Sequence, residues 1–141
     1  MPVAVIDIPS GLPWGTKEQL HKEVAESIHD AYQMPDNRVY LREWTPEQTS
    51  FDGVVGGSFR PMCNFLVPPI LTAEDRKTLV SRVSAAIAKA CDLRAEVVPL
   101  PSGDQVSTRW VLSFFFEVPL EQAALDGIMA FENPMVPKGK H

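Results

Sequence analysis

The residue whose type and position could do the most specific chemistry is Pro2. Methionine aminopeptidases generally remove an initiating methionine that precedes a small residue, and removal of Met1 would leave the secondary amine of Pro2 as the chain terminus. An ordinary α-amino group has a pKa of about 7.7–8.0, and burial beside apolar groups lowers it because burial disfavours the ammonium form. A neutral amine near pH 7 can act as a general base or a nucleophile. The sequence thus predicts a catalytic Pro2, with an ordinary Met-Pro start as the alternative.

The rest of the chain carries none of the common catalytic or metal-binding motifs. It has no G-x-S-x-G, H-E-x-x-H, Walker or C-x-x-C sequence. Cys63 and Cys91 are 28 residues apart, a spacing that fits no metal site, and free cysteine packs as a small hydrophobe. We therefore expect buried thiols and no metal bound by these cysteines.

Arginine is the residue type best suited to hold a substrate for such an amine. Arg38 opens a predicted strand, and a guanidinium binds a carboxylate or enolate oxygen in two-pronged geometry. A surface arginine at a strand end is the alternative. Three further arginines could take the same role, although residue type favours a structural or solvated position for each: Arg42, Arg60 and Arg109.

Trp14 follows the first predicted strand, and Trp44 ends the second. They could wall an apolar pocket or simply pack in the core or at an edge. An apolar, aromatic pocket would favour larger enolisable carbonyl compounds over three-carbon acids.

The elements that must position these residues begin with a short apolar strand over residues 3–8. A helix is expected from Thr16, capped with Gln19, to just before Pro35. Its apolar stripe comprises Leu20, Val24, Ile28, Ala31 and Tyr32. Residues 38–44 alternate with period two, which predicts a second strand, and a turn-rich segment follows up to residue 60.

The same pattern then restarts. A strand over residues 61–67, a helix capped by Thr72 with Asp75, a short strand near residues 97–100 and a very apolar strand over 111–118 are expected. Six pairs of like residues are 59 apart: Pro2 and Pro61, Val24 and Val83, Ile28 and Ile87, Ala31 and Ala90, Val39 and Val98, and Leu41 and Leu100. We predict a single domain, residues 1–141, with repeat one at about 2–58, repeat two at about 61–118 and a tail at 119–141. Each repeat is an α/β unit of tandem β-α-β type with parallel strands.

Composition limits the classes of partner. The 141 residues have a net charge of −5 and only 13 basic residues without a cluster, so nucleic acid is excluded as a partner. No apolar run approaches the roughly 20 residues of a membrane span, and the start of the chain lacks signal-peptide features. We expect a cytoplasmic protein with no membrane partner. Because two helices cover one face of a sheet whose strands are apolar on both, neighbouring subunits should cover the other face.

The order of Pro2, strand, helix, strand and paired glycines resembles the tautomerase superfamily, whose members use an amino-terminal proline. Residues 22–28 (KEVAESI), the Arg38-Val39-x-Leu41-x-Glu43 strand and Gly56-Gly57 carry the resemblance. The doubled length and the tail, through Glu117-Val118-Pro119, are most similar to the fused branch of cis-3-chloroacrylic acid dehalogenase-like proteins. The resemblance implies a homotrimer whose sheets line a central barrel, a catalytic Pro2 and no cofactor or metal.

The sequence also departs from this branch. Its dehalogenases and decarboxylases carry two carboxylate-binding arginines just after the third strand, where this chain reads Val67-Pro68-Pro69-Ile70-Leu71. Tyr32 stands near their helix histidine and Phe114 near their water-activating tyrosine. Arg38 aligns with an arginine that 4-oxalocrotonate tautomerase lends across a subunit boundary, so the resemblance implies substrate contacts for Arg38, Tyr32 and Phe114. Arg109 is a candidate substitute for the missing arginine pair.

Three functions therefore remain open. The first is a keto-enol tautomerase in which Pro2 moves a proton on an enolisable carbonyl or 2-oxo acid. The second is a hydratase, dehalogenase or decarboxylase of small unsaturated or 3-oxo acids. The third is a non-catalytic trimer that binds a small ligand.

Overall fold

The computed structural model describes residues 1–137, and the last four residues of the predicted tail lie outside them. Two β-α-β units follow one another along the chain. The first consists of β1 (Val3–Pro9), α1 (Trp14–Tyr32) and β2 (Arg38–Trp44), and the second of β5 (Met62–Val67), α2 (Ala73–Ala90) and β8 (Leu112–Glu117). Their strands form one sheet in the order β2-β1-β5-β8, parallel within each unit and antiparallel where β1 meets β5. The mixed α/β architecture predicted from the sequence is confirmed.

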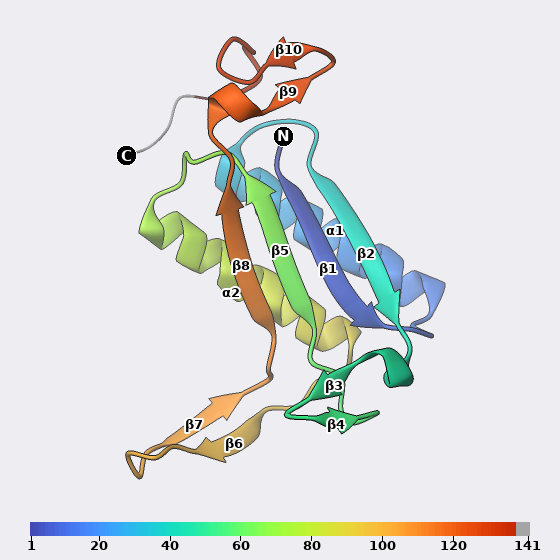
Figure 1. Ribbon diagram of the computed structural model, residues 1–141. Helices are drawn as coiled ribbons and strands as arrows, with labels where there is room; N and C mark the ends of the chain where they lie inside the picture. Colours follow the sequence, from blue (N-terminus) through green and yellow to red (C-terminus); the bar gives the residue numbers. More distant parts are fainter. Residues whose placement is uncertain (138–141) are drawn as a thin grey trace.

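Both helices lie side by side on one face of this sheet (Figure 1). Alternate strand residues point toward them, so Ile6, Cys63 and Phe65 are fully buried against helix residues such as Val24 and Val83. Phe65 also stacks on Phe115, with ring centroids 4.8 Å apart. Each large apolar side chain buried here contributes about 1.5–3 kcal/mol, so this layer holds the two units together.

Short hairpins and 3₁₀ turns lie at the two ends of the sheet (Figure 1). At one end lie the hairpins β3 (Ser50–Phe51) with β4 (Val54–Val55) and β6 (Glu96–Pro99) with β7 (Gln105–Thr108). A 3₁₀ turn, η1 (Pro46–Gln48), precedes β3. At the end where the chain starts lie η2 (Leu120–Gln122) and the hairpin of β9 (Ala124–Leu125) and β10 (Ile128–Met129). The chain start and the segment after β8 therefore share one end of the molecule.

The 59-residue spacing assigns the wrong counterparts, Val98 and Leu100, to Val39 and Leu41 of β2. Val98 lies in β6 opposite Val106 of the β6–β7 hairpin, outside the four-stranded sheet. The true counterpart of β2 is β8, because Val3 pairs with Arg38 as Met62 pairs with Leu112. The hairpin is an insertion in the second unit, and a like residue at the right spacing concealed it.

The predicted cap of the first helix is also wrong. α1 begins at Trp14, two residues before Thr16, and its N-cap Pro13 makes no side-chain hydrogen bond. The fixed φ of −60° at Pro13 turns the chain directly into the helix, and its carbonyl accepts from the Lys17 N–H at 3.1 Å. In α2 the prediction is confirmed, since the Thr72 hydroxyl accepts from the Asp75 N–H at 3.1 Å.

The face of the sheet away from the helices is open in the single chain. It exposes five large side chains, each 40–53% accessible: Tyr40, Leu66, Leu112, Phe114 and Phe116. Single chains rarely leave so many aromatic and aliphatic groups together in water, so this face has the character of a contact surface. No helix within residues 1–137 is both long and apolar enough to cross a membrane.

Candidate active site

Pro2 is buried at the start of β1 and is held by the neighbouring strand. Its carbonyl accepts a hydrogen bond from the Arg38 N–H at 3.0 Å, and the next residue, Val3, pairs with Arg38 on one side and Leu66 on the other. Three elements therefore meet at Pro2, and its position is fixed by backbone pairing.

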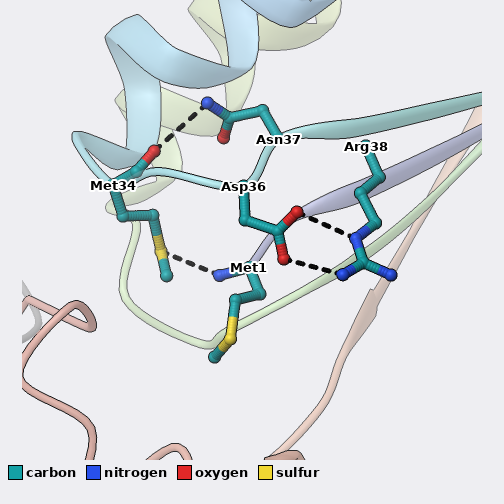
Figure 2. Close-up of polar contacts among 5 residues, drawn as sticks. All are labelled: Met1, Met34, Asp36, Asn37 and Arg38. Atoms are coloured by element: carbon teal, nitrogen blue, oxygen red, sulfur yellow. Dashed lines mark hydrogen bonds and ion pairs between the residues drawn. The ribbon is translucent and has the colours of Figure 1, made fainter. Parts of the chain in front are cut away.

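The amino group of Met1 lies at this position in a partly buried setting. It donates to the Met34 Sδ atom at 3.2 Å (Figure 2). Burial lowers its pKa from the ordinary 8.0 to about 6, while the charge of Asp36 opposes this change and that of Arg38 reinforces it. The Met1 amine is therefore mostly neutral at pH 7.

Asp36 and Arg38 form a charged pair next to the amine (Figure 2). Arg38 Nε and Nη2 donate to the two carboxylate oxygens of Asp36 at 2.9 and 3.0 Å. Because the Arg38 side chain is about half exposed, solvent and an incoming anion can both reach it. Pro2 and Arg38 are thus the two predicted site residues that the structure brings together.

A cavity of about 180 Å³ adjoins the amino terminus. One side is formed by the chain start and the end of β5, and the other by the segment that follows β8. The lining residues are Met1, Val3, Leu66, Val67, Pro68, Val118, Leu120, Ala123, Ala130 and Val136. Within the described part of the chain, no charged or hydroxylic side chain contributes to this lining, so the cavity is a dry neighbour for an amine.

Three predicted site residues lie elsewhere in the single chain. Tyr32 is 2% exposed and packs in the core between helix and sheet, where burial, reinforced by the Glu117 carboxylate, raises its pKa well above the ordinary value. Phe114 lies on the open face of β8, opposite Asn64. Arg109 is exposed just after β7, at the opposite end of the sheet from Pro2. Their substrate contacts remain predictions.

A second cavity, of about 650 Å³, lies where β1, β2, β5 and β8 meet the β3–β4 hairpin. Asp7, only 5% exposed, accepts from Arg42 Nε and Nη2 at 2.9 Å and from Trp44 Nε1 at 2.6 Å. The Arg60 guanidinium stacks 3.8 Å above the Trp110 ring. In the sequence, the feature that could have indicated this network is Asp7, a carboxylate within the apolar strand predicted over residues 3–8.

Of the two tryptophans considered from the sequence, Trp44 lines the 650 Å³ cavity, whereas Trp14 is 78% exposed and lines neither cavity. The sequence reasoning also missed the segment after β8 as part of the site. It was expected only as a tail, because its short strands carry no strong periodic pattern.

Solved structures share this fold, although no family model and no curated protein sequence matches the chain. A symmetric trimer of fused 4-OT gives a TM-score of 0.75 at 16% identity, over 92% of this chain and 97% of that chain. N1, a member of the cis-3-chloroacrylic acid dehalogenase family, gives 0.71 at 12% identity, over 98% and 85%. Malonate semialdehyde decarboxylase gives 0.64 at 13% identity, over 91% and 93%. All three belong to the superfamily that the sequence resembles, so that resemblance is confirmed at the level of the fold.

Proposed function

We propose that this chain, which has the fused two-unit fold of the tautomerase superfamily, is a tautomerase-type enzyme that needs no cofactor and whose base is the amine of Pro2. Removal of Met1 would free this amine. The observation that carries the proposal is the partly buried Met1 amine, whose pKa burial lowers to about 6, because the amine of Pro2 would start the chain one residue further into the same end of the sheet, where Pro2 is buried. A base must be unprotonated at its working pH, and partial burial beside apolar groups favours that state.

The proposed reaction transfers one proton. The lone pair of the neutral Pro2 nitrogen takes a proton from the carbon next to a carbonyl group, and the electron pair of the broken C–H bond forms an enolate. Arg38 binds the enolate oxygen or the substrate carboxylate through its guanidinium. The protonated Pro2 then returns the proton to oxygen or to another carbon, so that substrate and product are isomers.

We also propose that the working form is a homotrimer. The fused 4-OT neighbours are symmetric and asymmetric trimers, and the open sheet face of this chain exposes Phe114, Phe116 and Leu112. A second copy on this face would bury these side chains, and it would bring further residues to the small-molecule site.

A hydratase or decarboxylase reaction is the second candidate, because one structural neighbour is a decarboxylase with hydratase activity. The segment after β5 argues against it. It carries no arginine, and its Ile70 and Leu71 are 5% and 6% exposed in the core. A small acid would lack a paired grip on its carboxylate there.

The test compares the chain with its Pro2→Ala variant. Intact mass spectrometry first establishes whether Met1 is absent, and enol-to-keto conversion of phenylenolpyruvate is then followed in both proteins. We expect a loss of about 10²-fold or more on substitution, in the range of a removed general base, and no such loss for Pro9→Ala at the other end of β1.

Covalent labelling gives an independent readout. 3-Bromopyruvate should modify Pro2 rapidly at pH 7, as peptide mass mapping would show. Retained Met1, equal rates in the two proteins or an unreactive amine would each contradict the proposal. Turnover of 3-haloacrylates or malonate semialdehyde instead would favour the second candidate.

A further inference from the structure

The end of the sheet opposite the chain start holds a second proline in the position that Pro2 has in the first unit. Pro61 is buried directly before β5, and its carbonyl accepts from the Leu112 N–H at 3.1 Å. The carbonyl of Pro2 accepts from the Arg38 N–H at 3.0 Å in the same way. Because β1 and β5 are antiparallel, the two prolines lie at opposite ends of the sheet. The nitrogen of Pro61 belongs to a peptide bond, so this end has no amine that could act as a base.

The side chains beside the two prolines differ in kind. Asp7 of β1 pairs with the first residue of β5 on one side and with Arg42 of β2 on the other. At the end near Pro2, Leu66 of β5 pairs with the first residue of β1 and with Phe116 of β8. The far end of the sheet therefore carries an ion pair where the end at Pro2 carries two apolar side chains.

Asp7 holds the Arg42 guanidinium in a fixed orientation. It accepts from Nε and Nη2 of Arg42, both at 2.9 Å, and from the Trp44 indole. Within residues 1–137, Nη1 of Arg42 makes no hydrogen bond, and the Arg42 side chain is 51% exposed. A buried carboxylate costs free energy unless it is paired, and this pairing leaves one edge of the guanidinium available to a ligand.

Arg60 supplies a second guanidinium to the same cavity. Its central carbon lies 3.8 Å from the centroid of the Trp110 ring and 5.6 Å from that of Phe51. Its ion pair with Asp52, at 3.2 Å, is weak because the Asp52 side chain is 80% exposed to water. The two aromatic rings therefore orient Arg60, and an anion can compete with Asp52 for its hydrogen-bond donors.

The cavity that contains both guanidinium groups has a volume of about 650 Å³. Figure 1 shows the β3–β4 and β6–β7 hairpins at this end of the sheet, and residues around both help to line it. Its aromatic side chains are Trp44, Phe51, Phe59 and Trp110. Cavities of about 300–1,000 Å³ that combine apolar walls with a few polar groups are typical of small-molecule sites.

The charges of the lining indicate how many charges a ligand can carry. The charged lining residues are Asp7, Arg42, Asp52 and Arg60, whose charges sum to zero. A ligand with one negative charge is therefore better matched than one with two. An apolar cavity of about 150 Å³ holds one benzene ring, so this cavity has room for two fused rings.

We propose that the cavity around Pro61 is a second small-molecule site, which binds an aromatic monocarboxylate and does not transform it. The carboxylate of the ligand binds Arg42 and Arg60, and its ring system packs against the aromatic side chains of the lining. Guanidinium groups hold carboxylates through paired, charge-assisted hydrogen bonds. This site does not depend on whether Pro2 is catalytic.

Indole N–H signals in ¹H–¹⁵N spectra of the full-length chain, in its native assembly, locate the binding. Trp44 and Trp110 line the cavity, whereas Trp14 lies outside it and is 78% exposed. 2-Naphthoate should shift the first two signals and leave that of Trp14 unchanged. It should bind at least about tenfold more tightly than 2-naphthamide, which lacks the charge, and than acetate, which lacks the rings.

Arginine variants test the two guanidinium groups. Arg60→Gln should weaken 2-naphthoate at least about tenfold, whereas Arg82→Gln, which breaks an exposed ion pair of α2, should leave it unchanged. Arg42→Gln should act like Arg60→Gln. If the unpaired Asp7 prevents that variant from folding, Asp7→Asn combined with Arg42→Gln removes both charges together and tests the same guanidinium.

Binding of 2-naphthoate that shifts Trp44 and Trp110, weakens in the arginine variants and persists in Pro2→Ala supports the inference. Equal binding of 2-naphthoate and 2-naphthamide, or equal losses in Arg60→Gln and Arg82→Gln, overturns it. Tighter binding of 2-naphthyl phosphate also overturns it, because the site would then take a doubly charged ligand. Unresponsive Trp44 and Trp110 signals, as expected if a neighbouring subunit fills the cavity, overturn it as well. Failure of the enol-to-keto assay would contradict only the proposed function.

Discussion

We expect the freed amine of Pro2 to titrate near the pKa of about 6 that the Met1 amine has, and the neighbouring Asp36 and Arg38 should shift this pKa in opposite directions. Burial is the main cause of the lowered pKa, and Asp36 opposes it by stabilising the ammonium form. Asp36→Asn should therefore lower the pKa further. It also removes the carboxylate that pairs with Arg38, so the guanidinium repels the ammonium more strongly. Arg38→Gln should raise the pKa.

The magnitudes follow from the titration curve. With a pKa of about 6, about 90% of the amine is neutral at pH 7, against about 10% for an amine of pKa 8.0. The neutral form that can act as a base is thus about tenfold more abundant. Because Asp36 and Arg38 are both partly exposed, solvent screening limits the effect of each substitution to at most about one pH unit.

Folding stability should report the same titration. The folded state has the lower pKa, so between pH 8 and pH 6 the unfolded chain binds more protons and the free energy of unfolding falls as the pH falls. Below about pH 6 the free energy of unfolding has lost the full contribution of this amine. Two pH units correspond to about 2.7 kcal/mol, an upper bound that the half-exposed position of the amine reduces.

The assay combines two measurements on the chain and its two variants. NMR of ¹³C-proline-labelled protein follows the ring carbons of Pro2 as the pH changes, and kcat/KM for enol-to-keto conversion is measured over the same range. The rate should rise through about pH 6 in the parent, earlier in Asp36→Asn and later in Arg38→Gln. A midpoint near pH 8 that neither substitution moves would refute the reasoning.

Other predictions concern parts of the fold away from the amine. Asp7→Ala removes three hydrogen bonds to a buried carboxylate and should lower the free energy of unfolding by about 2–4 kcal/mol. Glu43→Gln breaks an exposed ion pair and should lower it by less than about 1 kcal/mol. Equal losses for the two variants in urea unfolding would contradict this difference. Thr72→Ala should cost about 1 kcal/mol, measured in the same way, while Thr16→Ala should cost less because Thr16 caps nothing. Burial raises the pKa of the Cys63 thiol to about 12, so a disulfide reagent at pH 8 should modify it only on unfolding, and labelling of the folded chain would refute its burial.

Local patterns were sufficient to predict the main elements. The stripe of Leu20, Val24 and Ile28 in α1 and that of Leu79, Val83 and Ile87 in α2 all point into the core, as their spacing indicates. The alternation in β2 likewise places Val39 and Leu41 toward the helices. These patterns succeed because the periods of helix and strand are set by the backbone itself.

Long-range pairing was less accessible to sequence reasoning. Val97 and Val98 satisfy a strand pattern equally well in the central sheet or in a hairpin, and the structure pairs them with Ser107 and Val106. Local propensity records that a segment is extended, but the partner is decided by the connections and the core of the whole chain.

By itself, the sequence determined that a proline follows Met1, that a strand starts directly after it, and that Arg38 opens the second strand of the first unit. Tertiary structure alone decided that the chain start is partly shielded from water, because residues such as Ala130 and Val136, at the other end of the sequence, complete the apolar cavity beside it. The pKa of an amine depends on what surrounds it in space, and those surroundings exist only once the chain has folded.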